Sequence, residues 1–70
     1  MRFMRLQEVI QVTGLGRSSI YKQMAEGKFP QGVNLGARSV AWVSDEIDDW
    51  MLGRIADRDG EEATLEASAH

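Results

Sequence analysis

The sequence predicts a mainly α-helical domain with a small β-hairpin, and three observations support this prediction. Two short helical patterns, residues 6–13 and 17–26, follow each other with only three residues between them. Two alternating stretches lie within residues 33–42 on either side of a glycine-containing turn. A third helical pattern begins at Ser44. The order helix, turn, helix, two-stranded wing and C-terminal helix is that of a winged helix-turn-helix.

The first helix is predicted to begin at Leu6, because Leu6, Val9 and Ile10 have the i, i+3, i+4 spacing of one packed helix face. Arg5 stands where a serine or threonine would cap the helix better, so the first turn is weakly specified. Gly14 follows as a C′ glycine, which adopts a positive φ readily and ends the helix.

The second helix is predicted to follow Gly16, a tolerable N-cap, and to stop at Gly27 after a run without a helix breaker. Ile20 and Met24 lie one turn apart and would face the core. Because only Gly-Leu-Gly joins the two helices, they have too little chain to lie antiparallel and must cross steeply. Leu15 is expected to fill the angle between them.

A two-stranded hairpin is predicted after Pro30, because the residue before a proline is disfavoured in a helix. Residues 33–35 and 39–42 alternate, and residues 36–38 would form a three-residue loop. A lone hairpin is not stable in water, so one face must pack on the helices. The residues expected on that buried face are Val33, Leu35, Val40 and Trp42.

A third helix is predicted to begin at Ser44, a good N-cap, with Asp45 and Glu46 complementing the helix dipole in its first turn. The apolar stripe expected to face the core consists of Ile47, Trp50, Met51 and Ile55. Trp42 and Trp50 lie on the hairpin and on this helix, which favours core packing over a platform for stacking bases.

The apolar pattern fails after residue 56, and Asp57 to Gly60 is expected to break the chain. The residues beyond contain a single large apolar side chain, Leu65. We therefore predict two parts, a winged helix-turn-helix domain at residues 1–56 and an acidic, disordered tail at residues 57–70.

The composition excludes most catalytic and metal chemistry. The sequence has no cysteine, and its single histidine is the last residue, His70. Ser18 and Ser19 therefore have no histidine partner in the predicted domain for nucleophilic catalysis. The acidic residues near the start of the third helix lack the spacing of an EF-hand and fit a solvated helix face. We expect no catalytic residues, no metal, no cofactor and no small-molecule substrate.

A membrane location is not expected either. No apolar run approaches the roughly 18 residues of a membrane span, and residues 1–5 lack the apolar core of a signal peptide. These features predict a cytoplasmic protein that does not contact a membrane.

The charge is unevenly distributed along the chain. Residues 1–42 carry six Lys and Arg against two Asp and Glu, whereas residues 43–70 carry two against nine, and the formal net charge is −3. A basic first part and an acidic second part suit a protein that turns one side to a polyanion. The alternative is ordinary charge separation on a solvated surface.

The chain also resembles a known family. The residues that carry the resemblance are Arg5-Leu6 with Glu8-Val9, Thr13-Gly14-Leu15, Arg17-Ser18-Ser19-Ile20-Tyr21, Glu26-Gly27-Lys28-Phe29-Pro30, Leu35-Gly36 with Arg38, Trp42, and Glu46-Ile47 with Trp50. In this order and spacing they are similar to the AlpA family of prophage regulators, which belongs with the excisionase-like, MerR-related winged helices. The resemblance covers residues 4–52, and Gly16 departs from the serine usual at that position.

The resemblance implies a sequence-specific DNA-binding transcriptional regulator of a prophage or integrative element. A related alternative is an excisionase, a recombination directionality factor that bends attachment-site DNA, and no residue separates the two roles. A protein-binding antirepressor is a further alternative, but it would need an exposed apolar patch that the sequence does not show outside the inferred core. The expected partner is double-stranded DNA. Further copies of the chain on repeated sites are expected, because a single module has a small interface, roughly 600–1,000 Å².

The predicted DNA contacts lie on the second helix and on the wing. In a helix-turn-helix the second helix enters the major groove with its N-terminal part towards the bases. With Ile20 and Met24 facing the core, the residues predicted to contact DNA from this helix are Arg17, Ser18, Ser19, Tyr21 and Lys22. Arg17 can donate two hydrogen bonds to a guanine edge or one to a phosphate. The alternative is a solvated polar helix face.

Arg38, at the tip of the wing, is predicted to contact flanking phosphates or the minor groove, which attracts arginine where it is narrow. Lys28, which follows the second helix, is predicted to touch the DNA backbone. Arg5 and Arg2 are weaker candidates. The alternative for Arg38 is a charged hairpin tip that keeps the protein soluble.

Overall fold

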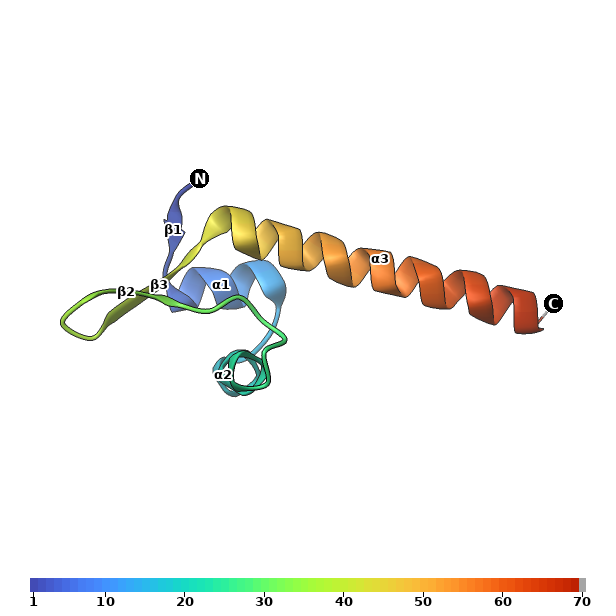
Figure 1. The fold of residues 1–70 in the computed structure, drawn as a ribbon, viewed down its shortest axis with the longest axis horizontal. Coiled ribbons are helices and arrows are strands. Elements are labelled where there is room, and N and C mark those ends of the chain that lie inside the picture. The colour runs from blue at the N-terminus through green and yellow to red at the C-terminus, as the bar shows by residue number, and fades with distance from the viewer. Residues whose placement is uncertain (70) are drawn as a thin grey trace.

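In the computed structural model, the backbone is described for residues 1–69 and the side chains for residues 1–60. The elements in chain order are β1 (Phe3–Met4), α1 (Leu6–Thr13), α2 (Arg17–Ala25), β2 (Val33–Gly36), β3 (Ser39–Val43) and α3 (Ser44–Ala69) (Figure 1). Within this described part the fold consists of three helices and a small antiparallel sheet, which confirms the predicted mainly α, winged helix-turn-helix class. The side chain of Leu65 and the whole of His70 lie outside the described residues.

The helix-turn-helix forms as the glycines predict. Arg5 precedes α1 in an extended conformation and makes no side-chain cap, while Gly14 ends the helix with a φ of 76°. Its N–H donates to the carbonyl oxygen of Ile10 at 2.8 Å. The second helix ends at Ala25, one residue earlier than predicted, and Gly27 follows with a φ of 73°. The two helices cross steeply, since α2 is seen end-on where α1 lies across the view (Figure 1).

The sheet has a third strand that the sequence did not predict. Its strand order is β1-β3-β2, so β3 is central rather than half of a lone hairpin. Phe3 pairs with Val43 and Met4 with Trp42. The pairing continues into the next residues, where the Ser44 N–H donates to the Arg2 carbonyl and the Arg2 N–H donates to Ser44 Oγ, both at 2.8 Å. The Ser44 hydroxyl, which we predicted to cap α3, therefore accepts a bond from the residue that precedes β1.

The prediction that Val33 shares a buried face of the hairpin with Val40 and Trp42 is wrong. Val33 pairs with Ala41 and Asn34 pairs with Val40. Because residues directly opposite each other point to the same face, Val33 cannot share a face with Val40, and a shift of one residue exchanges the two faces. The alternation could not fix the register because β3 is buried on both faces, with Ala41 and Trp42 both fully buried. Leu35, predicted to be buried, is 45% exposed.

The hydrophobic core draws on almost every element. Its buried cluster consists of Met4, Val9, Ile20, Phe29, Trp42 and Ile47. Trp42 is completely buried and its Nε1–H donates to the Pro30 carbonyl at 3.1 Å, so its predicted core position is confirmed. Trp50 is only partly buried and packs against the edge of the cluster. Ile55, which we placed on the buried stripe, is exposed.

The third helix is longer than predicted. We expected a break at Asp57 to Gly60, but the backbone is helical to Ala69, and its C-terminal half extends beyond the domain, away from the wing (Figure 1). A glycine inside a helix costs about 1 kcal/mol, which weakens a helix without ending it. No proline interrupts the segment, and the ion pair between Arg54 and Asp57 supports the backbone there at i, i+3 spacing. The division into a domain at residues 1–56 and a tail at residues 57–70 stays a prediction.

Candidate nucleic-acid interface

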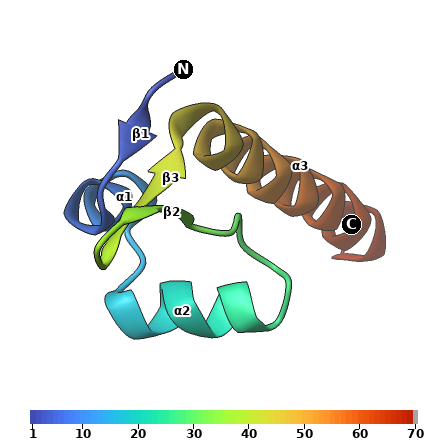
Figure 2. The same cartoon turned by 60° about the vertical axis from the view of Figure 1, so that its left-hand side comes forward.

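The first turn of α2 is open to solvent. Arg17, Ser18 and Ser19 begin this helix and are all exposed. Gly16 precedes them in an extended conformation and offers no side-chain oxygen to the first N–H groups. A helix N-terminus without a side-chain cap keeps backbone donors and the positive end of the dipole available to an anion. Both ribbon views show α2 at one edge of the domain (Figures 1 and 2).

Tyr21 connects α2 to the base of the wing. Its ring meets that of Trp42 edge-on, with the centroids 6.3 Å apart and the planes at 70°. The guanidinium carbon of Arg17 lies 5.8 Å from the centre of the Tyr21 ring, within cation–π range. Because Trp42 is fully buried, these two contacts fix the direction of an otherwise exposed tyrosine and arginine.

A hollow of about 280 Å³ lies between α2, the start of α1 and the wing, and we call it the wing-side surface. It is lined by Arg5, Leu6, Gln7, Tyr21, Arg38, Val40 and Trp42. Arg5 was only a weak candidate in the sequence, yet it lies on the same surface as Arg38. The feature of the sequence that could have drawn attention to Arg5 is its poor fit as a helix cap.

The wing tip is tighter than predicted. Gly36 pairs with Ser39, so the loop has two residues, Ala37 and Arg38, instead of three. Both have positive φ values, 42° and 68°, as in a type I′ turn. Asn34 stabilises the backbone that leads into the turn, because its Oδ1 accepts a hydrogen bond from the Gly36 N–H at 2.8 Å. A left-handed conformation is uncommon for alanine or arginine, so this turn holds Arg38 at the tip under backbone strain.

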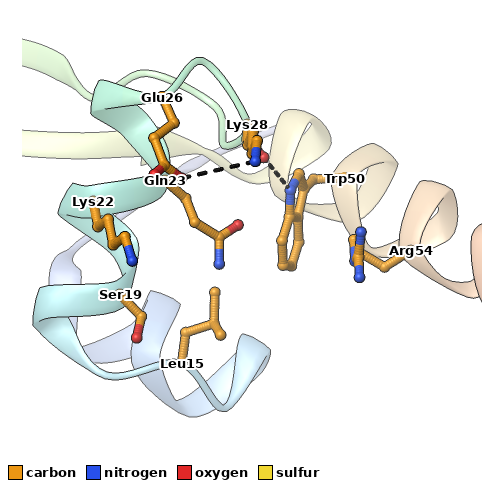
Figure 3. Close-up of a pocket in the computed structure, with 8 residues that line it drawn as sticks. All are labelled: Leu15, Ser19, Lys22, Gln23, Glu26, Lys28, Trp50 and Arg54. Carbon is orange, nitrogen blue, oxygen red and sulfur yellow. Dashed lines mark hydrogen bonds and ion pairs between the residues drawn. The ribbon is translucent and has the colours of Figure 1, made fainter.

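A second hollow, of about 510 Å³, lies between α2 and α3, and we call it the α3-side surface. Its lining residues are Leu15, Ser19, Lys22, Gln23, Glu26, Lys28, Trp50 and Arg54 (Figure 3). All seven predicted contact residues are exposed, but the structure divides them. Tyr21 and Arg38 line the wing-side surface, with Arg17 against Tyr21, and Ser19, Lys22 and Lys28 line the α3-side surface, whereas Ser18 lines neither. Arg54, which was not among the predicted contact residues, also lines this second surface.

A two-point ion pair with Glu8 occupies Arg2, one of the weak candidates. Both terminal nitrogens of Arg2 donate to the carboxylate of Glu8, one of them at 2.8 Å. This bond to Arg2 holds the pKa of Glu8 below its ordinary value, and it raises the pKa of Arg2. The paired arginine is therefore less available to a phosphate than Arg17 or Arg38.

Metal binding finds no support in the part of the chain that the structure describes. No three His, Cys, Asp or Glu side chains among these residues are grouped closely enough to hold an ion. Among the same described residues, no helix is long and apolar enough to span a membrane.

Comparison with known proteins gives matches over the same region. Residues 2–55 match the family model described as "Prophage CP4-57 regulatory protein (AlpA)". The chain is 49% identical over 57 residues to an uncharacterized protein, ORF88, of Enterobacteria phage P4, covering 81% of the chain and 65% of that protein. It is 39% identical over 59 residues to the DNA-binding transcriptional activator AlpA of Escherichia coli K12, covering 76% of the chain and 84% of that protein. The matched region thus spans slightly less than two thirds of the phage P4 protein.

Proposed function

The chain belongs to the AlpA family of prophage regulatory proteins, and from this premise we propose that it binds double-stranded DNA and regulates transcription for a prophage. The relative from Escherichia coli is a DNA-binding transcriptional activator, which supports activation over repression for this chain. The protein acts by binding and not by catalysis, and it works in the cytoplasm, where the DNA of a prophage lies.

One observation carries the proposal. The exposed first turn of α2, with Arg17, Ser18 and Ser19, lies within the family match and has no side-chain cap. A helix with its side chains is about 10–12 Å wide and the major groove is about 12 Å wide, so α2 can enter the groove along its exposed edge.

We assign the predicted contacts to roles on this basis. Arg17 donates to a guanine edge, and Ser18 and Ser19 donate to bases or phosphates from the first turn. Arg38 and Arg5 contact the backbone or the minor groove beside the wing, where Tyr21 directs its hydroxyl end towards the same strand. One such module has a small interface, so several copies on repeated sites would give useful specificity.

The test is binding to a tiled library of duplexes from the genetic element that encodes the protein, followed by footprinting. A footprint over a promoter supports the proposal. A footprint confined to the attachment site would replace it with a role in excision, and binding to no duplex would remove DNA binding altogether.

Arg17→Ala gives the sharpest prediction for the site. We expect it to weaken specific binding by about 1–3 kcal/mol and to relax the preference at one base pair, because a bidentate contact to one base is lost. The circular dichroism spectrum should not change, since the side chain is exposed. The matched control is Arg58→Ala, which removes an exposed arginine from α3, away from both surfaces. An equal loss over all sequences would instead assign Arg17 to a phosphate.

A further inference from the structure

We propose that the α3-side surface binds the sugar–phosphate backbone of the DNA strand opposite to the strand that the wing meets, with Arg54 of α3 as a contact residue. The inference rests on the proposed function and adds a second flank to it. The wing-side surface and the α3-side surface lie against the same helix, α2, and each is lined by cationic side chains.

The charge of the α3-side surface fits a phosphate backbone. Lys22, Lys28 and Arg54 line it against a single carboxylate, that of Glu26. Glu26 lies 4.0 Å from Lys28 Nζ, and Arg54 lies 3.5 Å from the carboxylate of Asp57. These side chains are well exposed, and exposed ion pairs are weak, so both cations can exchange their partner for a phosphate at little cost.

The surface is also built to hold its shape. The backbone of Lys28 is fixed on both sides, because its N–H donates to the Gln23 carbonyl at 2.8 Å and its own carbonyl accepts Trp50 Nε1–H at 2.8 Å. The Trp50 ring meets Phe29 edge-on at 4.8 Å between centroids. Arg54 follows Trp50 by one helical turn and so lies on the same face of α3. The indole therefore positions the cations of the loop and of α3 beside each other.

The position of this surface along α2 points to the opposite strand. Ser19, Lys22, Gln23 and Glu26 follow i, i+3, i+4, i+7 spacing, which is one continuous stripe of the helix. Tyr21 lies on the other flank and faces the wing-side surface. Figure 3 shows Lys22 and Gln23 on the α2 side of the hollow, with Trp50 and Arg54 facing them from α3.

The dimensions of the duplex place the two flanks of α2 against different DNA strands. A helix about 10–12 Å wide fills a major groove about 12 Å wide, so the flanks of the helix face the two backbones that border the groove. The wing-side surface meets one backbone and the α3-side surface meets the other. In this arrangement α2 is held by phosphate contacts on both of its flanks instead of on one.

The first experiment measures the salt dependence of binding to a random-sequence duplex for the wild-type protein, Arg54→Gln and Arg58→Gln. Both substitutions remove one positive charge from an exposed, ion-paired arginine on α3, but Arg58 lies one turn beyond the surface. We expect Arg54→Gln to reduce the slope of log K against log salt by about 0.9, the value for one lost phosphate contact, and Arg58→Gln to leave it unchanged. Equal slopes for the two variants would overturn the inference.

Trp50→Phe tests the positioning role, because phenylalanine keeps a ring but cannot donate to the Lys28 carbonyl. We expect Trp50→Phe to reduce the slope of log K against log salt, because Lys28 and Arg54 lose the positioning that the indole provides. If Trp50→Phe does not fold, Lys28→Gln replaces it, and the double variant Lys28→Gln/Arg54→Gln should lose a slope of about 1.8, for two phosphate contacts. A double variant no different from Arg58→Gln would also overturn the inference.

The second experiment assigns the strands. At the site found by footprinting, phosphate-ethylation interference should disappear on one strand with Arg54→Gln and on the other strand with Arg38→Gln. Disappearance on the same strand would overturn the opposite-strand assignment. If the wild-type protein binds no duplex, the proposed function fails and this inference falls with it. If Arg17→Ala and Arg38→Gln weaken binding while Arg54→Gln behaves like Arg58→Gln, only this inference fails.

Discussion

The residues up to Met51 and the nine that follow, the last whose side chains are described, are held by different forces. Each helix in the first region, together with β1 and β3, contributes a side chain to the buried cluster around Trp42. In the second region, residues 52–60, every side chain is exposed, although the backbone is helical throughout. Burial therefore fixes the first region, whereas only local hydrogen bonds and exposed ion pairs act within the second. Regular secondary structure in this molecule does not by itself indicate a contribution to stability.

The largest expected effect comes from the centre of the first region. Trp42→Ala should lower the free energy of unfolding by about 3–5 kcal/mol, because it opens a cavity and leaves the Pro30 carbonyl without its donor. Trp50→Ala should cost less, since Trp50 is only partly buried. Chemical denaturation followed by circular dichroism measures both.

If Trp42→Ala is unfolded before denaturant is added, the milder variant Trp42→Phe takes its place, and its loss in free energy of unfolding is compared with that of Trp50→Ala. A greater loss for Trp50→Ala would show that the core is centred on α3 and not on β3.

Two glycines compare the regions directly. A Cβ at Gly32 would lie 2.5 Å from Val40 Cγ1, so Gly32→Ala forces a stiff β-branched side chain to move and should cost about 1–3 kcal/mol. At Gly53, inside α3, a Cβ would meet nothing within 4 Å. Gly53→Ala should therefore raise stability by about 0.5–1 kcal/mol through helix propensity. The comparison breaks if both variants change the melting temperature in the same direction.

Removing residues 57–70 should leave the fold almost unchanged. We expect a change in the free energy of unfolding within about 0.5 kcal/mol, as for surface changes generally, together with a loss of helical signal in circular dichroism. The deleted segment carries one arginine against five acidic residues, so random-sequence duplex should bind more tightly at low salt and the gain should shrink as salt rises.

The direction of α3 gives the reason for the tighter binding. The helix extends away from the wing, so the segment acts by repelling DNA and not by covering the basic surfaces (Figure 1). A melting transition that collapses on truncation would show that the segment packs on the domain. Identical binding curves at low salt would show that its charge has no influence.

The smallest effect is expected at the exposed pair of Arg2 and Glu8. Arg2 lowers the pKa of Glu8 in the folded state, so the pair stabilises the fold above the unfolded pKa and loses this effect as pH falls through the folded pKa. Glu8→Gln should slightly lower the melting temperature near neutral pH, and the difference should vanish once the pH falls below the lowered pKa of Glu8. A difference that grows on acidification would contradict the assignment.

The sequence predicted what depends on local chemistry. Gly14 and Gly27 have the positive φ expected of glycines that follow a helix, and α1 begins and ends at the predicted residues. Long-range pairing was not predictable in the same way. The strand β1 has only two residues, and it is stable only because β3 offers it a partner distant in sequence. The hairpin register depends on which face of β3 meets the helices, and a strand buried on both faces carries no alternation to indicate it.

The candidate site shows the same division. The exposure of Arg17, Ser18 and Ser19 followed from the helical spacing of the residues around them. The grouping of Arg5 with Arg38, and of Arg54 with Lys28, depends on how α2, the wing and α3 pack together. The periodicity of one helix contains no information about which cation of another element lies beside it.

The bonds between Arg2 and Ser44 also bear on the order in which the molecule folds. They join residues 42 positions apart, and the loop they close contains the helix-turn-helix and the wing. Helices and hairpins form within microseconds, whereas closing a long loop costs chain entropy that is recovered only when distant side chains have packed. We therefore expect the ladder between β1 and β3 to form after the elements it encloses.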